Sequence, residues 1–385
     1  MAMTYCKRAY SLLIILLLTI SIPTQAAMIS EKYQCPKQQQ VVYKFDSGNS
    51  WSFCWMWSKQ QGLSLHDLNF YSAKENLDIY IASSLQLNQI EMVFNGDTTN
   101  TAHIIQHDKS QSKIEGNCTT GQLLADNDNT PIICLSKSTK DFAMQYDELS
   151  RRQYSVDLYH VVTLNDHQFL SRIQLNDDGS FSPTVSFITD NTTQSIPYTI
   201  NYFWRIDFDI GATANNDTVE EFRSKIRQGR NGRQIHTLTF NKLNEFKKRY
   251  NRIKMKSWRI IDKQIHNDYN MHSSYHIFPL NHNVFERDPN RPWTQADIFF
   301  TNYNVCETKA IANDSLPCGN NIAAMTNGEK LDDVVVWVRL TAHHTPPYSS
   351  NADLAPIWQY FTVYPRDIYS KNPNAPDIDM PQQLN

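Results

Sequence analysis

The chain has 385 residues, and 36 Lys and Arg stand against 39 Asp and Glu, for a formal net charge of −3 at pH 7. This balance excludes a general electrostatic attraction to nucleic acid or to an anionic membrane surface. Aromatic residues make up 12% of the chain, a content that suits sheets packed face to face. The composition therefore favours a globular β protein.

The first 26 residues have the pattern of a secretory signal peptide. Lys7 and Arg8 form a basic start, and the apolar run of residues 11–22 follows. That run is shorter than the about 20 apolar residues that a transmembrane helix needs. We predict cleavage after Ala26, export to a periplasm or the cell exterior, and a single domain over residues 27–385 without a transmembrane segment.

Six cysteines remain once the predicted signal peptide is removed. An even number in an oxidising compartment predicts disulfides, and six cysteines allow fifteen pairings. Proximity in the sequence favours three of these pairings. They are Cys35 with Cys54, Cys118 with Cys134, and Cys306 with Cys318.

Short segments rich in β-branched and aromatic residues follow one another, separated by clusters of Asn, Asp, Gly and Ser. Such patterns predict strands joined by turns, and the clusters at 95–97 and 177–180 predict hairpins. The predicted strands cover residues 77–81, 89–94, 154–163, 168–175, 198–210, 297–302 and 333–340. The sequence thus predicts an all-β fold, mainly antiparallel, built as a large β-sandwich with few short helices.

Residues 219–259 differ, because they carry thirteen Lys or Arg and are predicted to be partly helical. One interpretation of residues 223–259 is a docking patch for an anionic polymer or surface. The other is an ordinary solvated face, which the lack of an accompanying aromatic stacking pattern favours. We expect no nucleic-acid partner.

Four segments, taken in order, resemble the catalytic domain of the copper- and topaquinone-dependent amine oxidases. They are residues 51–68, 151–179, 202–211 and 333–373. The resemblance implies the large C-terminal β-sandwich of that family, a homodimer, and descent from primary-amine oxidases. It spans nearly all of the predicted mature chain.

The resemblance also implies a reaction centre, made of a tyrosine that becomes topaquinone, three copper-binding histidines and an aspartate base. The matched register places His167 at the quinone-forming tyrosine, and Tyr198 and Ile200 at two of the copper-binding histidines. His344 stands at the third histidine, and Asp108 is the candidate base. An imidazole has no phenol ring to hydroxylate, and an alkyl chain does not bind copper. We therefore expect neither topaquinone nor copper.

A peripheral Ca²⁺ site is a further implication of the resemblance. Asp207, Asp209 and Asp333 stand at its carboxylate positions, and Phe208 and Val334 offer backbone carbonyl oxygens. Oxygen ligands of this kind suit Ca²⁺. The alternative is that Asp207 pairs with a neighbouring cation and that Asp333 merely ends a strand.

Three functions stay open at this point. The first is a non-catalytic relative that keeps the sandwich as a scaffold for binding or assembly. The second is a working amine oxidase with an altered active site, including a degenerate metal site made of His167, His344 and Tyr198. The third is a secreted binder of anionic polymer through residues 223–259. The loss of three positions in two independently matched segments favours the first.

Overall fold

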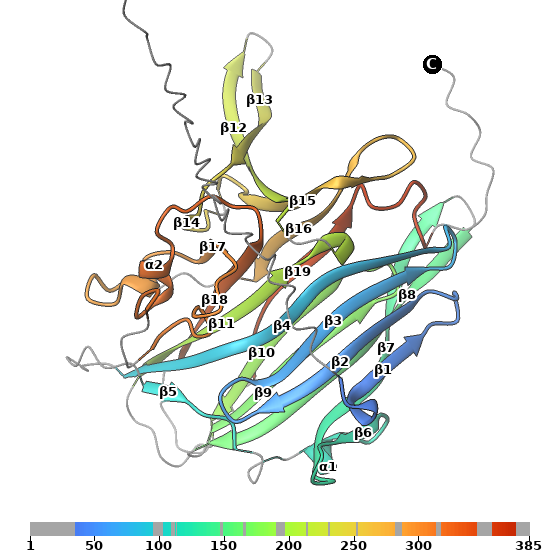
Figure 1. The fold of residues 1–385 in the computed structure, drawn as a ribbon, viewed down its shortest axis with the longest axis vertical. Coiled ribbons are helices and arrows are strands. Elements are labelled where there is room, and N and C mark those ends of the chain that lie inside the picture. The colour runs from blue at the N-terminus through green and yellow to red at the C-terminus, as the bar shows by residue number, and fades with distance from the viewer. Residues whose placement is uncertain are drawn as a thin grey trace, which may run out of the picture. The chain divides into compact units, whose positions relative to one another are not determined.

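Two antiparallel β-sheets make up most of the chain (Figure 1). The computed structural model describes residues 35–94, 103–108, 112, 114–146, 149–164, 167–189, 197–212, 215–229, 232–251, 253–281, 287–312, 317–344 and 356–374. The predicted all-β fold is confirmed. The signal peptide predicted over residues 1–26 and the turn predicted at 95–97 lie outside the described residues.

The two sheets contain nine and ten strands within that part of the chain. The first runs in the order β1 (Gln40–Lys44), β2 (Ser50–Ser58), β3 (Gly62–Ser72), β4 (Leu77–Phe94), β11 (Tyr198–Phe208), β18 (Val334–His344), β17 (Ile298–Asn302), β14 (Phe246–Lys248), with β5 (His103–Ile105) pairing β4. The second runs in the order β13 (Gly232–Lys242), β12 (Asp217–Gly229), β15 (Ser257–His266), β16 (His272–Asn281), β19 (Ile357–Arg366), β10 (Phe181–Thr189), β9 (His167–Asn176), β8 (Leu149–Leu164), β7 (Pro131–Tyr146), β6 (Gln122–Ala125).

Helical elements among the described residues are short. They are η1 (Lys37–Gln39), α1 (Ile114–Asn117), η3 (Ile210–Ala212), η4 (Pro292–Thr294) and α2 (Ile322–Met325). No helix in this part of the chain is long and apolar enough to cross a membrane.

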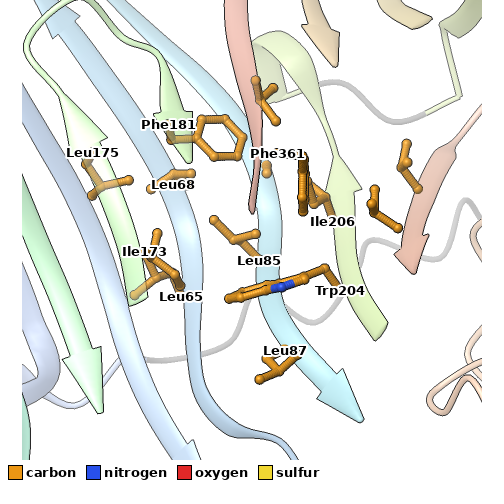
Figure 2. Packing of buried hydrophobic residues seen from close by; sticks show 14 of the residues in the cluster. Leu65, Leu68, Leu85, Leu87, Ile173, Leu175, Phe181, Trp204, Ile206 and Phe361 are labelled. Carbon is orange, nitrogen blue, oxygen red and sulfur yellow. The ribbon is translucent and has the colours of Figure 1, made fainter. Parts of the chain in front are cut away.

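The core lies between the sheets, because side chains alternate between the two faces of a strand and the apolar ones face inward. Leu65 and Leu85 of the first sheet belong to the same buried cluster as Ile173 and Phe181 of the second (Figure 2). Trp204 of β11 lies among them and is 0% exposed. Burial of large apolar side chains is the main stabilising term in such a sandwich.

One face of the first sheet is covered by the described residues 287–297, 303–312 and 317–332, here called the covering segment. Gln89 of β4 exchanges two hydrogen bonds with the backbone of Ile311, at 2.7 and 2.8 Å. Glu91, also on β4, is 0% exposed and accepts a hydrogen bond from Arg291 Nη1 at 2.8 Å. The predicted strands at 77–81 and 89–94 are therefore one strand, β4, whose polar residues bind the covering segment instead of forming a turn.

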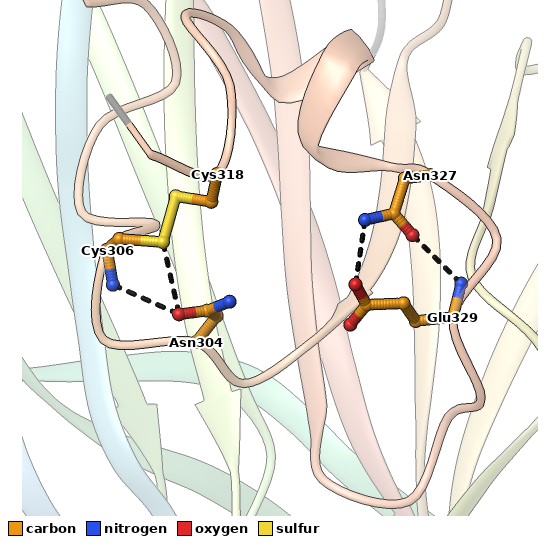
Figure 3. Close-up of a disulfide and its surroundings, with 5 residues drawn as sticks. All are labelled: Asn304, Cys306, Cys318, Asn327 and Glu329. Atoms are coloured by element: carbon orange, nitrogen blue, oxygen red, sulfur yellow. Dashed lines mark hydrogen bonds between the residues drawn. A yellow bond between two sulfur atoms is a disulfide. The ribbon is translucent and has the colours of Figure 1, made fainter. Parts of the chain in front are cut away.

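Two predicted disulfides are confirmed. Cys118–Cys134 and Cys306–Cys318 have Cα atoms 5.6 and 6.1 Å apart. Cys35 and Cys54 are disulfide-bonded as well. Cys306–Cys318 closes a loop of the covering segment, and the Cys306 N–H donates to Asn304 Oδ1 at 3.3 Å beside it (Figure 3).

The prediction of helix within residues 219–259 is wrong. β12 and β13 form an antiparallel hairpin from the pair Val219–Lys242 to the pair Gly229–Gly232, and β12 also pairs β15. Burial alternates with a period of two at the start of β12, which is the strand period, whereas the number of basic residues carries no information on period. Figure 1 shows this hairpin extending beyond its neighbouring strands.

Candidate functional site

Three residues that the resemblance assigns to a reaction centre lie together at one end of the β11–β18 strand pair. Tyr198 begins β11 and pairs with His344 of β18, and their rings stack with centroids 4.5 Å apart. His167 begins β9 in the other sheet, and its ring centroid lies 5.2 Å from that of Tyr198. The fold thus brings these three positions together from both sheets.

Aromatic rings enclose this group. Phe94 and Phe187 have ring centroids 5.8 and 6.2 Å from that of Tyr198. His167, Tyr198 and His344 are 2%, 1% and 3% exposed. Within the described residues, the Tyr198 hydroxyl has no hydrogen-bond partner. We call these five residues the aromatic cluster.

The aromatic cluster favours uncharged side chains. Burial raises the pKa of Tyr198 well above its ordinary value. Burial also lowers the pKa of His344, and the neighbouring His167 and His343 lower it further. At neutral pH, Tyr198 is therefore a protonated phenol and His344 an uncharged imidazole.

A three-histidine copper centre does not fit these residues. Ile200 pairs with Ala342 and Met92 in the register of the first sheet and is 0% exposed, so an alkyl chain fills that position. Position 167 carries no phenol that could be oxidised. In the part of the chain that the structure describes, no group of three or more His, Cys, Asp or Glu side chains is placed to hold a metal ion. The residues at these positions therefore do not fit chemistry through copper or a quinone.

Asp108 is the candidate base. It follows β5 and is half-buried. The preceding residue, His107, donates its backbone N–H to the Lys59 carbonyl at 2.8 Å, which ties this segment to the turn between β2 and β3. Asp166, the residue before His167, lies outside the described residues.

Carboxylates gather at the other end of the β11–β18 pair. Asp207 lies 3.2 Å from Arg205, measured from Oδ2 to Nη1, so the ion pair of the alternative interpretation is present. Burial, and next the nearby charge of Asp207, raise the pKa of both Asp209 and Asp333 to about 7. The Asp333 carbonyl accepts a hydrogen bond from the Tyr303 N–H at 2.8 Å. We call Asp207, Asp209 and Asp333 the carboxylate cluster.

A fourth carboxylate, which no sequence pattern predicted, lies near this cluster. Asp217 is 0% exposed, and neither carboxyl oxygen has a hydrogen-bond partner among the described residues. Burial raises its pKa to about 9, and Asp262, Asp209 and Asp333 contribute in that order. Asp217 faces Asp262 in the β12–β15 register. The two residues are far apart in the sequence, so their contact could not be predicted from local patterns. The four carboxyl groups therefore repel one another when charged, and a bound proton or cation would relieve that repulsion.

Solved structures with the same fold include amine oxidases. The copper-containing benzylamine oxidase from Hansenula polymorpha has a TM-score of 0.67 at 13% sequence identity, covering 86% of this chain and 62% of that chain. Pichia pastoris lysyl oxidase has a TM-score of 0.62 at 14% identity, covering 84% and 52%. Aspergillus nidulans amine oxidase has a TM-score of 0.64 at 15% identity, covering 92% and 56%.

These comparisons confirm that the fold resembles the catalytic domain of copper amine oxidases. This chain spans only 52% to 62% of the length of those three proteins. No family model matches the sequence, and no curated protein does so either. At such identities the likeness concerns the fold alone.

Proposed function

We propose that this chain is an exported amine-oxidase-like protein that performs no quinone chemistry and serves as a scaffold for binding or assembly. The packing of the aromatic cluster carries this proposal. The resemblance implies that His167 takes the quinone-forming position, and its ring packs against Tyr198, which stacks on His344. Aromatic packing of this kind stabilises a core without any ligand.

The direct test is a search for the quinone and the metal. The purified full chain is treated with phenylhydrazine, and copper is measured in the same sample, with the Hansenula polymorpha benzylamine oxidase as the positive control. We expect no coloured adduct and no Cu(II) signal in electron paramagnetic resonance. A stoichiometric adduct would overturn the proposal and favour an amine oxidase with an altered active site.

We propose that Ca²⁺ binds the carboxylate cluster, with the carbonyls of Phe208 and Val334 completing the oxygen set. The three described carboxylates are not gathered around one point, so binding would draw them together. The raised pKa values of Asp209 and Asp333 support this, since a cation would replace the proton that each carboxyl otherwise retains near pH 7. The expected result is a thermal midpoint that rises with added Ca²⁺ and not with equimolar Mg²⁺. No response to either ion would count against the site.

A homodimer is proposed as the assembled form, and the β12–β13 hairpin supports it. Ile226 and Ile235 face each other across the hairpin and are 58% and 69% exposed. A two-stranded ribbon is marginally stable alone in water, so a partner that covers this apolar pair would stabilise it. Sedimentation should show a dimer that Ile226→Ser with Ile235→Ser weakens, whereas the matched polar variant Gln228→Ser leaves it intact. A wild-type monomer would contradict the proposal.

A second candidate function is binding of an anionic polymer by the same hairpin. Lys225, Arg227 and Arg233 are exposed there, while Arg259 is engaged by Glu220 and Asp367, each at 2.8 Å. Charge reversal of the three exposed residues should abolish retention on a sulfated polysaccharide column. Retention that survives this change would leave the segment as a solvated face.

A further inference from the structure

Two buried histidines that the matched active site does not use lie close together. His107 follows β5, and His160 lies on β8 of the other sheet. Both are 1% exposed, and their ring centroids are 5.9 Å apart. Trp57 of β2 packs against His160 with centroids 6.2 Å apart, which helps to fix that ring.

The ring nitrogens of this pair are not satisfied by the described residues. His160 Nδ1 lies 3.1 Å from the Ile132 carbonyl, and since a carbonyl only accepts, Nδ1 carries the proton and Nε2 keeps a lone pair. His160 Nε2 and both nitrogens of His107 are buried without a hydrogen-bond partner in the described part of the chain. Unpaired buried polar atoms are costly and rare. Three such nitrogens in one pair of adjacent rings are therefore available to bind a ligand.

A proton or a water molecule does not satisfy these nitrogens. Burial lowers the pKa of His107 to about 3, with a further contribution from His160, and burial lowers that of His160 to about 4. Both rings are thus neutral at neutral pH, and their lone pairs are free to bind. The space beside them is lined by apolar residues including Leu87, Ile90 and Phe169, and it does not admit a water-sized sphere. A bare metal ion is smaller.

The geometry of the pair suits a metal ion bound by two nitrogens. Metal–imidazole bonds are roughly 2 Å long, and rings whose centroids lie 5.9 Å apart can present nitrogens on either side of one ion. The Ile132 carbonyl orients His160 through its other nitrogen, as second-shell groups do for metal-binding imidazoles. Gly62 allows His107 its place, because a Cβ there would lie 2.8 Å from the ring.

The charge of the surroundings selects the kind of ion. The polar groups lining the space beside the two rings, Ser171 and Tyr202, are neutral hydroxyls, and the rest of the lining is apolar. Zn²⁺ normally takes four ligands, and a divalent charge without a carboxylate or thiolate is very costly to bury. A monovalent ion with filled d orbitals accepts two imidazoles in a near-linear arrangement and carries less charge. Imidazole suits copper among such metals.

We propose that His107 and His160 hold a single Cu(I) ion between the two sheets, through Nε2 of His160 and one ring nitrogen of His107. This site is separate from positions 198, 200 and 344 of the matched register. An ion bound only by these two rings would have no water ligand. Its role would be structural, as a link between the segment that follows β5 of the first sheet and β8 of the second.

The experiment uses the purified full chain under anaerobic conditions and titrates it with Cu(I) buffered by a competing chelator. We expect one equivalent to bind, and X-ray absorption to show two nitrogen neighbours. His107→Leu and His160→Leu should each weaken binding at least a hundredfold. The matched controls His344→Leu, in the aromatic cluster, and His236→Leu, exposed on β13, should leave affinity and stoichiometry unchanged.

A second measurement uses the wild-type chain and does not depend on the folding of a leucine variant. Ag(I), an air-stable monovalent probe, should shift the ring-nitrogen resonances of two histidines in the ¹⁵N-histidine-labelled wild-type chain. Unchanged binding in both leucine variants, loss of binding in His344→Leu, or tight Zn²⁺ binding with none of Cu(I) would each overturn the proposal.

Discussion

The two ends of the β11–β18 strand pair differ in almost every chemical respect. Tyr198 and Asp207 lie on one strand, about 30 Å apart at about 3.4 Å per residue. At the first end, aromatic rings from both sheets pack against one another. At the second, carboxylates crowd together, and burial and mutual repulsion raise the pKa values of Asp209 and Asp333.

The two ends therefore differ in whether they need a ligand to be stable. The aromatic cluster is stable on its own, because packed rings need no partner from outside. The carboxylate cluster is incomplete, because its charges call for a proton or a cation. Between the two ends, both strands are buried along nearly their whole length.

The largest expected effect comes from breaking the ion pair at the charged end. Arg205→Met leaves Asp207 buried without its cation, and removal of one partner of a buried pair costs about 3–5 kcal/mol. We expect urea denaturation to show that loss in the free energy of unfolding. The double variant with Asp207→Asn should recover part of it. Wild-type stability in Arg205→Met would mean that the pair does not hold this end together.

The next effect would turn the aromatic end into a metal site. Tyr198→His with Ile200→His places two imidazoles on one face of β11, since residues two apart point the same way, next to His344 of β18. Cu(II) affinity should rise at least a hundredfold, about 2.7 kcal/mol, with a copper signal in electron paramagnetic resonance. In the control, Tyr198→His with Thr199→His, the second imidazole points to the other face. An equal gain in the control would contradict the matched register.

Removal of Ca²⁺ should expose a pH dependence at the charged end. The folded-state pKa values of Asp209 and Asp333 are about 7 and that of Asp217 about 9, above the ordinary 3.8. The folded state then binds more protons than the unfolded state from about pH 4 to 9, so the free energy of unfolding falls as pH rises through this range. Ca²⁺ at tenfold its Kd should restore about 1.4 kcal/mol at high pH.

Thermal midpoints in EDTA and in Ca²⁺ at pH 5, 7 and 9 measure this effect. Other groups also titrate, so the difference between wild type and Asp217→Asn isolates the contribution of Asp217. The variant should lose less stability than wild type between pH 5 and 9. Parallel curves for the two proteins would contradict the assignment.

The smallest effect is expected from removing one hydroxyl at the aromatic end. Tyr198→Phe should change the free energy of unfolding by less than about 0.5 kcal/mol, because that hydroxyl has no partner among the described residues. The matched control is Tyr275→Phe, which loses a hydrogen bond of 3.2 Å to the Gly179 carbonyl and should cost about 1 kcal/mol. Equal losses would show that the Tyr198 hydroxyl is satisfied after all.

Local patterns were enough to predict the fold class. Alternation of apolar residues is read within one strand, so segments such as 154–163 and 168–175 were found, and they lie within β8 and β9. The cysteine pairs were predicted because their partners are near in sequence. Both signals depend on neighbours along the chain.

Contacts between distant segments were out of reach. His107 meets His160, and Asp217 meets Asp262, only because strands far apart in the sequence are brought together. The polar residues of β4 suggested a break, because the covering segment that binds them comes some 200 residues later. The helix predicted within 219–259 failed because a count of charges was read as a structural signal.

The order of the strands also has a consequence for how the chain reaches this fold. In the first sheet β18 lies between β11 and β17, and in the second β19 lies between β16 and β10. Each sheet thus has one of the last two described strands in its interior. Neither sheet can close until these strands have been synthesised, and non-local pairings of this kind make folding slow. A growing chain would therefore carry open strand edges beside β11 and β10 until β18 and β19 are added, and such edges invite aggregation. Such a chain needs protection of these edges until its final strands have been synthesised.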